Sequence, residues 1–168
     1  MSENLSALCP GFDAGGARVT IEKLTLDRDR RKLCLSLFCD SFDGELPGRI
    51  EGYLRGEYPG LEVSVEPAFP ASCFCDAAFQ FVVRRLIAAG LPVNGFFFGS
   101  SADCDGETVT VTLTHGGLSV LTAVGFERAF AAETRRCFGF SPRVTFTGVT
   151  EVETVTMAPA RPREELPF

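Results

Sequence analysis

The chain has 168 residues, of which 45% are hydrophobic and 23% charged, and its formal net charge is -6. This length suits one medium domain, or two small ones packed together, and it can bury a real core. An acidic chain lacks the overall field that attracts phosphate backbones, so general nucleic-acid affinity is expected to be weak. No apolar run approaches the roughly 20 residues that cross a bilayer, no signal peptide is visible, and the seven cysteines cannot all pair, which together predict a cytoplasmic protein with reduced thiols.

The first half of the chain predicts a hairpin, a helix and a third strand. After a loose lead-in over 1–17, the expected segments are, in chain order, strand 19–27, strand 31–39, helix 45–58 and strand 61–66. Alternating apolar and polar residues indicate the strands, and an apolar stripe with helical spacing indicates the helix. By its period of two, the second strand places four apolar side chains on one face: Leu33, Leu35, Leu37 and Cys39.

The second half predicts a helix, then strand, helix and strand. Ser72 is the expected N-cap of the first helix, Gly90 closes it, and Gly139 ends the second. The expected segments are helix 72–89, a loop over 91–106, strand 107–114, one long helix over 117–138 and strand 143–147. The tail over 151–168 is rich in proline and is expected to be a linker.

A weak internal repeat relates the segments 18–67 and 72–150. KLCLSLF, a helix and LEVSV in the first resemble TVTVTLT, a helix and RVTFT in the second. A strand–helix–strand crossover makes parallel neighbours, whereas the opening hairpin is antiparallel. The sequence therefore predicts a single α+β domain over 18–150, with one mixed sheet of about five strands shared by both halves and helices packed on one face.

Residues with catalytic or metal-binding chemistry are sparse. His115 is the only histidine, and although a histidine at the end of a strand can act as a base or ligand, the sequence shows no partner for it. Cys73 and Cys75 form a single C-x-C pair without the second pair that structural zinc uses. Phosphate-binding glycine loops, nucleophile elbows and paired core carboxylates are also missing. The sequence predicts no catalytic constellation, metal site or cofactor.

Two surface segments are candidates for recognition. Phe96, Phe97 and Phe98 lie in a predicted loop; either the loop folds back and covers a helix with all three rings, or at least one ring is exposed to a protein partner. The other candidate is the hairpin tip, whose side chains either contact nucleic-acid phosphates or form a solvated turn. Its basic residues are Arg28, Arg30, Arg31 and Lys32.

The order of elements from Val19 to Val149 resembles the N-terminal region of the Gram-positive PolC-type DNA polymerase III alpha subunit. VTIEKLTLDRDRRKLCLSLF is similar to the opening hairpin of that family, with its polar, basic turn. ELPGRIEGYLRGEYPGLEVSVE is similar to its helix-then-strand segment. GETVTVTLTHGG, the following helix and CFGFSPRVTFT are similar to its second strand–helix–strand unit.

This resemblance implies a KH-like, non-catalytic appendage of a DNA-directed DNA polymerase, a nucleotidyltransferase of DNA replication whose catalytic modules would lie beyond Phe168. Its implied task is to dock other replisome proteins, the clamp-loader tau subunit among them. DNA contact through this domain is expected to be weak at most, because no GXXG loop lies at a helix–helix junction. The alternative from another class is a stand-alone α+β enzyme or ligand-binding protein with a pocket near His115.

Overall fold

The computed structural model describes residues 3–93 and 95–151. Its strands are β1 (Glu3–Asn4), β2 (Val19–Asp27), β3 (Lys32–Cys39), β4 (Glu62–Ala68), β5 (Ser101–Asp105), β6 (Thr108–Leu113) and β7 (Arg143–Gly148). Its helices are α1 (Leu5–Leu8), α2 (Leu46–Glu57), α3 (Asp76–Ala88), α4 (Leu118–Ala123) and α5 (Phe126–Phe138), with a 3-10 turn, η1 (Ala71–Cys73). The predicted tail falls almost entirely outside the described residues.

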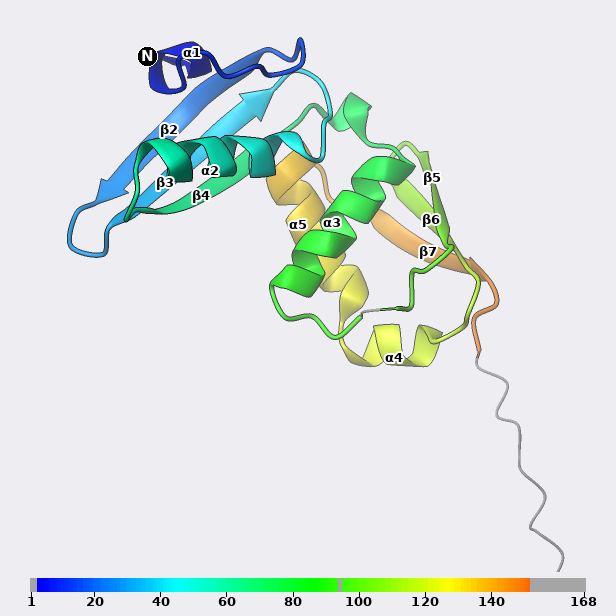
Figure 1. Cartoon of the computed structure of the whole chain (residues 1–168). Helices are drawn as coiled ribbons and strands as arrows, with labels where there is room; N and C mark the ends of the chain where they lie inside the picture. The colour runs from blue at the N-terminus through cyan, green and yellow to red at the C-terminus, as the bar shows by residue number, and fades with distance from the viewer. Residues whose placement is uncertain (1–2, 94, 152–168) are drawn as a thin grey trace, which may run out of the picture.

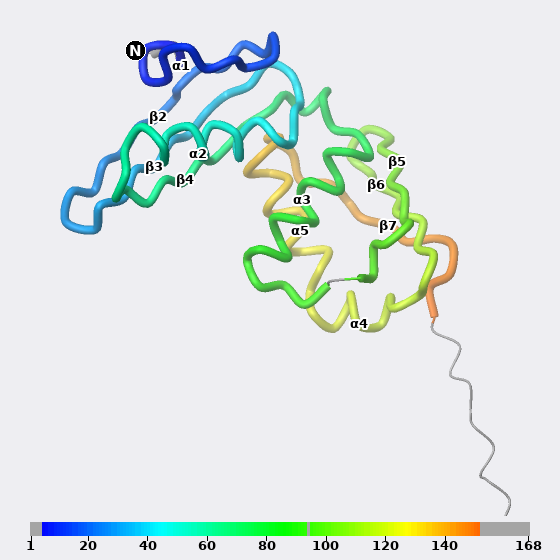
Figure 2. The backbone as a smooth tube through the Cα atoms, in the orientation of Figure 1, coloured from blue at the N-terminus to red at the C-terminus, as the bar shows by residue number. Residues whose placement is uncertain are grey.

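The strands form two separate mixed sheets, in the orders β1-β2-β3-β4 and β5-β6-β7. In each sheet a hairpin is antiparallel and a helical crossover returns to a parallel neighbour, as the chain path in Figure 2 shows. The predicted α+β class is thus confirmed, but the single shared sheet of about five strands is wrong.

The outer edge of β4 shows why the first sheet ends there. The backbone N–H of Val65 donates to the Glu51 carboxylate at 3.0 Å, and the carbonyl of Val63 accepts from Arg55 at 3.3 Å. Both side chains come from α2, so the crossover helix itself occupies backbone groups that another strand would need. A further strand would have to displace these contacts in order to join the first sheet at β4.

The first half follows the predicted pattern closely. The face of β3 with the four predicted apolar residues is buried, and Ile50 and Leu54 of α2 are fully buried in the same core. The lead-in is docked rather than loose, since Leu5 and Cys9 are also buried. Helices cover one face of this sheet and leave the other to solvent (Figure 1).

The second half departs from the prediction in three places. The first helix begins at Asp76 instead of Ser72, because the preceding residues form η1 and Cys75 is the N-cap. The expected long helix is broken into α4 and α5, because Gly125 adopts a left-handed φ of 69°. The expected loop over 91–106 contains β5, an edge strand that pairs with β6.

Aromatic rings join the two halves. Phe69 follows β4 and is 3% exposed, and its ring centroid lies 5.1 Å from that of Phe42, 6.0 Å from Phe81 and 5.4 Å from Phe138. Its backbone N–H donates to the carbonyl of Cys137 in α5 at 2.7 Å. Since Phe42 belongs to the first half and the other two rings to the second, Phe69 stands at the centre of the junction.

An ion-pair network lies beside this junction. Glu133 of α5 accepts from Arg85 of α3 at 2.5 Å and from Arg136 at 2.9 Å, and Arg136 reaches Glu66 of β4 at 3.7 Å. Desolvation by burial raises the pKa of Glu133, but the hydrogen bonds and charges of Arg85 and Arg136 outweigh it, so the net pKa is lowered. The carboxylate therefore stays charged and ties α3 and α5 to the first sheet.

Candidate protein-docking site

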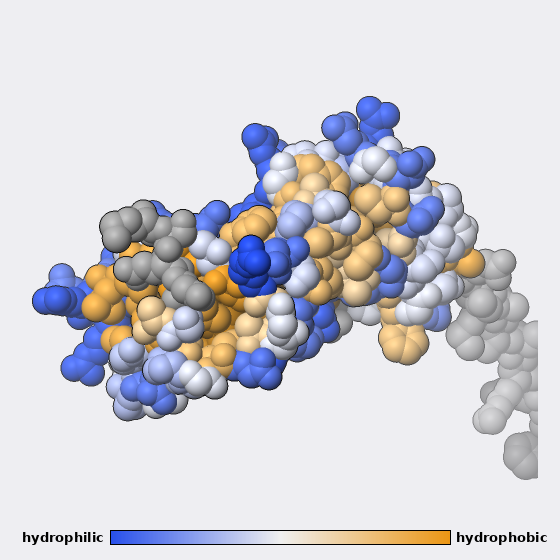
Figure 3. All heavy atoms as spheres, turned by 90° about the horizontal axis from the view of Figure 1, so that it is seen from above, coloured by the Kyte–Doolittle hydropathy of each residue, from blue (hydrophilic) through white to orange (hydrophobic). Residues whose placement is uncertain are grey.

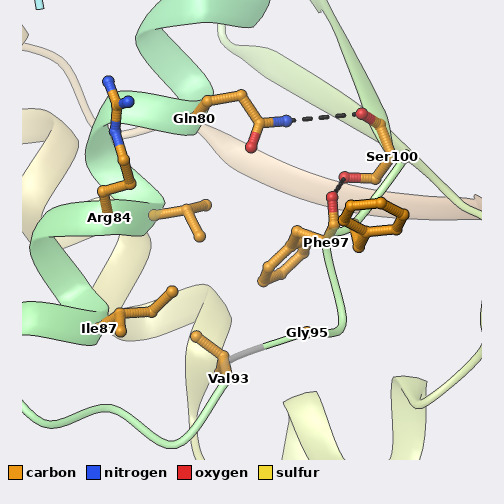
Figure 4. A pocket seen from close by; sticks show the side chains of 10 residues that line it. Gln80, Arg84, Ile87, Val93, Gly95, Phe97 and Ser100 are labelled. Carbon is orange, nitrogen blue, oxygen red and sulfur yellow. Dashed lines mark hydrogen bonds between the residues drawn. The ribbon is translucent and has the colours of Figure 1, made fainter.

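A hollow lies between the exposed side of α3 and the segment that connects it to β5 (Figure 4). Residues three or four positions apart along one face of a helix form one wall: Gln80, Val83, Arg84 and Ile87. The connecting segment supplies the other wall with Val93, Gly95 and the stretch from Phe97 to Ser100. The volume is about 350 Å³, enough for a large apolar side chain of a partner.

The floor of this hollow is apolar and its rim is polar. Val93 and Val83 are 0% and 3% exposed, so they are fixed parts of the core. Arg84 stands on the rim, where its guanidinium pairs with Glu45 at 3.4 Å. An apolar floor with a polar rim suits the binding of either an apolar side chain of a protein or a small apolar ligand.

Hydrogen bonds fix the backbone around the aromatic run. The hydroxyl of Ser100 donates to the carbonyl of Phe97 at 2.7 Å, and Gln80 of α3 donates to the carbonyl of Ser100 at 3.5 Å. The hydroxyl of Thr114, just after β6, donates to the carbonyl of Phe98 at 2.7 Å. The segment is thereby anchored to both neighbouring elements, which holds its backbone in place.

The three aromatic residues of this segment have different surroundings. Phe97 is 6% exposed and packs against Phe79 and Phe126, with ring centroids 5.5 Å and 4.7 Å away. Phe96 is half-buried against Gly117, where an added Cβ would lie 2.3 Å from the ring. Phe98 is 77% exposed, so a surface-exposed ring is present, and it is the one that a partner can reach.

His115 lies beside this exposed ring. Its imidazole is stacked on Phe98, with centroids 6.1 Å apart and an interplanar angle of 23°. Within residues 3–93 and 95–151, no three His, Cys, Asp or Glu side chains are grouped so that they could hold a metal ion. His115 therefore lies at the side of the exposed Phe98 ring.

The cysteines are unpaired thiols in different surroundings. Burial raises the pKa values of Cys39 and Cys137 to about 11, so these thiols stay protonated at neutral pH. Cys75 is exposed, and Cys73 is half-buried, with its thiol 4.0 Å from the carbonyl of Asp40.

The basic hairpin tip lies at the far end of the first sheet, away from the second half (Figure 1). Asp27 shapes the turn, because its carboxylate accepts the backbone N–H groups of Asp29 and Arg30 at 3.1 Å and 3.0 Å. The same carboxylate pairs with the Arg30 guanidinium at 3.8 Å, and Lys32 pairs with Glu62 at 3.0 Å. These acidic partners offset part of the positive charge that a phosphate backbone would meet, whereas Arg28 and Arg31 are exposed.

The hollow combines the predicted aromatic segment with a face of α3 that was not predicted to belong to a site. Gln80, Val83 and Ile87 fall within the predicted helix 72–89, and they line the hollow only because the connecting segment folds back over them. Arg84 is exposed on the rim. The basic hairpin tip and the aromatic segment are not brought together.

Among the described residues, no helix is both long and apolar enough to cross a membrane. Comparisons with protein-family models, with curated proteins and with solved structures return no match. The family resemblance therefore rests on the sequence segments quoted above, and the exposed Phe98 beside the apolar hollow is the chain's best-defined candidate site.

Proposed function

We propose that this chain is a non-catalytic protein-docking domain, and that Phe98 and the adjoining hollow receive the partner. The observation that carries the proposal is a 77% exposed phenylalanine on a backbone anchored by hydrogen bonds. Exposing such a ring costs solvation free energy, which binding recovers, and buried aromatic anchors dominate protein–protein interfaces.

On the strength of the sequence resemblance, we further propose that the domain is the N-terminal part of a PolC-type replicative DNA polymerase III alpha subunit. In that role the domain docks replisome proteins, with the clamp-loader tau subunit as the first partner to test. The net charge of -6 supports a protein partner over nucleic acid, because it repels phosphate backbones outside the hairpin tip.

The test is direct binding of purified tau subunit to the chain by isothermal titration calorimetry. Phe98→Ala should weaken binding about 30-fold or more, the loss typical of a central aromatic anchor. Tyr58→Ala is the matched control, since Tyr58 is a 41% exposed aromatic residue of the first half and its loss should leave the affinity unchanged. Equal affinity of the wild type and Phe98→Ala would reject the site, and absence of tau binding by the wild type would reject the partner.

DNA contact at the hairpin tip is tested separately by fluorescence anisotropy with labelled single-stranded DNA. Binding at low salt that Arg28→Ala and Arg31→Ala together abolish would assign a DNA role to the tip, since phosphate contacts are strongest at low ionic strength. We expect no more than weak binding at low salt, and none at physiological salt. Tight binding under physiological salt would overturn the protein-docking proposal.

A further inference from the structure

The outer edge of β2 is open along most of its length. β1 pairs with β2 only at Thr20 and Ile21, next to a bulge in the β2–β3 pairing. From Lys23 to Leu26, no described strand pairs with this edge. The opposite edge of the sheet is β4, which Glu51 and Arg55 close. The first sheet therefore has one protected edge and one that can accept another strand.

Two leucines on this open strand are exposed although they lie on the core face of the sheet. Leu24 is opposite Leu35 and Leu26 is opposite Leu33, so all four side chains project to the side that α2 covers. Yet Leu24 and Leu26 are 44% and 45% exposed, whereas Leu35 and Leu33 are 0% and 5% exposed. Seen from above, the first half shows hydrophobic surface close to its hydrophilic hairpin end (Figure 3).

The sequence of this edge is complementary to itself in the antiparallel direction. When two copies of β2 are placed antiparallel about Thr25, Lys23 of each copy faces Asp27 of the other, and Leu24 faces Leu26. Opposite charges and apolar pairs directly across an antiparallel ladder stabilise it, and like charges destabilise it. A two-fold axis through Thr25 keeps the leucines of both copies on one face of the joined sheet.

We propose that the segment Lys23–Asp27 pairs with the same segment of a second copy of this chain, joining the two first-half sheets into one continuous sheet. The exposed leucines of both copies then cover one another between the two α2 helices. Because the paired segment is short, the interface is smaller than those of stable dimers, and a dissociation constant on the order of 100 μM is expected. This contact is independent of Phe98, which belongs to the other half.

The experiment is sedimentation velocity of the full chain at concentrations from about 5 μM to about 500 μM. The wild type should shift from monomer toward dimer over this range. Lys23→Asp places two acidic residues opposite each other, and Asp27→Lys places two lysines opposite each other, so each variant alone should self-associate about 10-fold more weakly. An equimolar mixture of the two variants restores both opposite-charge pairs and should recover the dimer.

The mixture makes the test decisive. Asp27 also accepts backbone N–H groups in the hairpin turn, so Asp27→Lys alone could act by disturbing the turn, but a disturbed strand would not pair with the other variant. Arg128→Asp makes the same charge change as Lys23→Asp, but at an exposed position of α5, and should leave self-association unchanged. Phe98→Ala should also leave it unchanged. A wild type that stays monomeric throughout, or variants that dimerise like the wild type, would overturn the proposal.

Discussion

Truncation of Phe69 is the most informative perturbation of the fold, because this ring packs against rings from both halves of the chain. Replacing a buried phenylalanine by alanine removes its apolar burial and leaves a cavity, at a cost of about 3–5 kcal/mol. Here the ring contacts three other rings at centroid distances of 5.1, 5.4 and 6.0 Å, and such pairs add to simple burial. We therefore expect Phe69→Ala to lower the free energy of unfolding by about 4 kcal/mol.

Urea unfolding followed by far-ultraviolet circular dichroism measures this change. With a typical urea dependence of about 2 kcal/mol per molar, the midpoint should fall by about 2 M, and the transition should broaden if the halves separate before they unfold. Phe98→Ala is the control with identical chemistry at a 77% exposed position, where a change within about 0.5 kcal/mol is expected. If the two variants have the same midpoint, the junction is not packed as described.

Two further predictions concern titrating groups. Glu133→Gln should destabilise the chain at pH 7 by about 1–3 kcal/mol in thermal or urea unfolding, because it removes the charge that both arginines contact. Since the pKa of Glu133 lies below its ordinary value of 4.5, the wild-type advantage should be complete above that pH and decline as the pH falls below it; an advantage that grows on acidification would contradict the network. The second concerns thiols: with its pKa raised to about 11, Cys39 should resist iodoacetamide at pH 8 while the exposed Cys75 reacts, as peptide mass spectrometry would reveal. Equal labelling of the two would show that the core around Cys39 opens readily.

Strands and helices whose pattern is strong were predictable, and those fixed by tertiary contacts were not. Alternation in β3 and β6 gave the correct burial, since a period of two defines a face without knowledge of any neighbour. β5 was not predicted, because its inward residues, Ala102 and Cys104, are small and only half-buried and so give a weak alternating pattern. Its place is fixed by pairing with β6 and by a bond from the Ala102 N–H to the carboxylate of Asp76, at 2.6 Å.

The candidate site was predictable in part. The sequence left open whether every ring of the aromatic run is buried, and the structure answers that Phe98 is exposed while Phe97 is in the core. The hollow beside Phe98 could not be foreseen, because one wall is a face of α3 and the other is a segment whose path follows from single hydrogen bonds. Likewise, Gly125 could be read as a tolerated helix residue until its left-handed φ showed a break.

The open edge of β2 lies in the half of the chain whose helix before the hairpin is short. In the second half, the helix that precedes the hairpin is α3, which has 13 residues and packs over β5. Its counterpart in the first half is α1, which has only 4 residues and contacts β2 at the end that holds the buried Val19 and Ile21. A helix of that length spans about 6 Å, roughly the rise of two strand residues, so it cannot extend to Leu24 and Leu26. The short α1 therefore leaves these leucines exposed. The proposed self-pairing edge lies in one half and the proposed docking surface around Phe98 lies in the other. Because the two surfaces share no residue, a dimer joined through β2 would present two copies of Phe98 to partners at once, which raises effective concentration without any new contact.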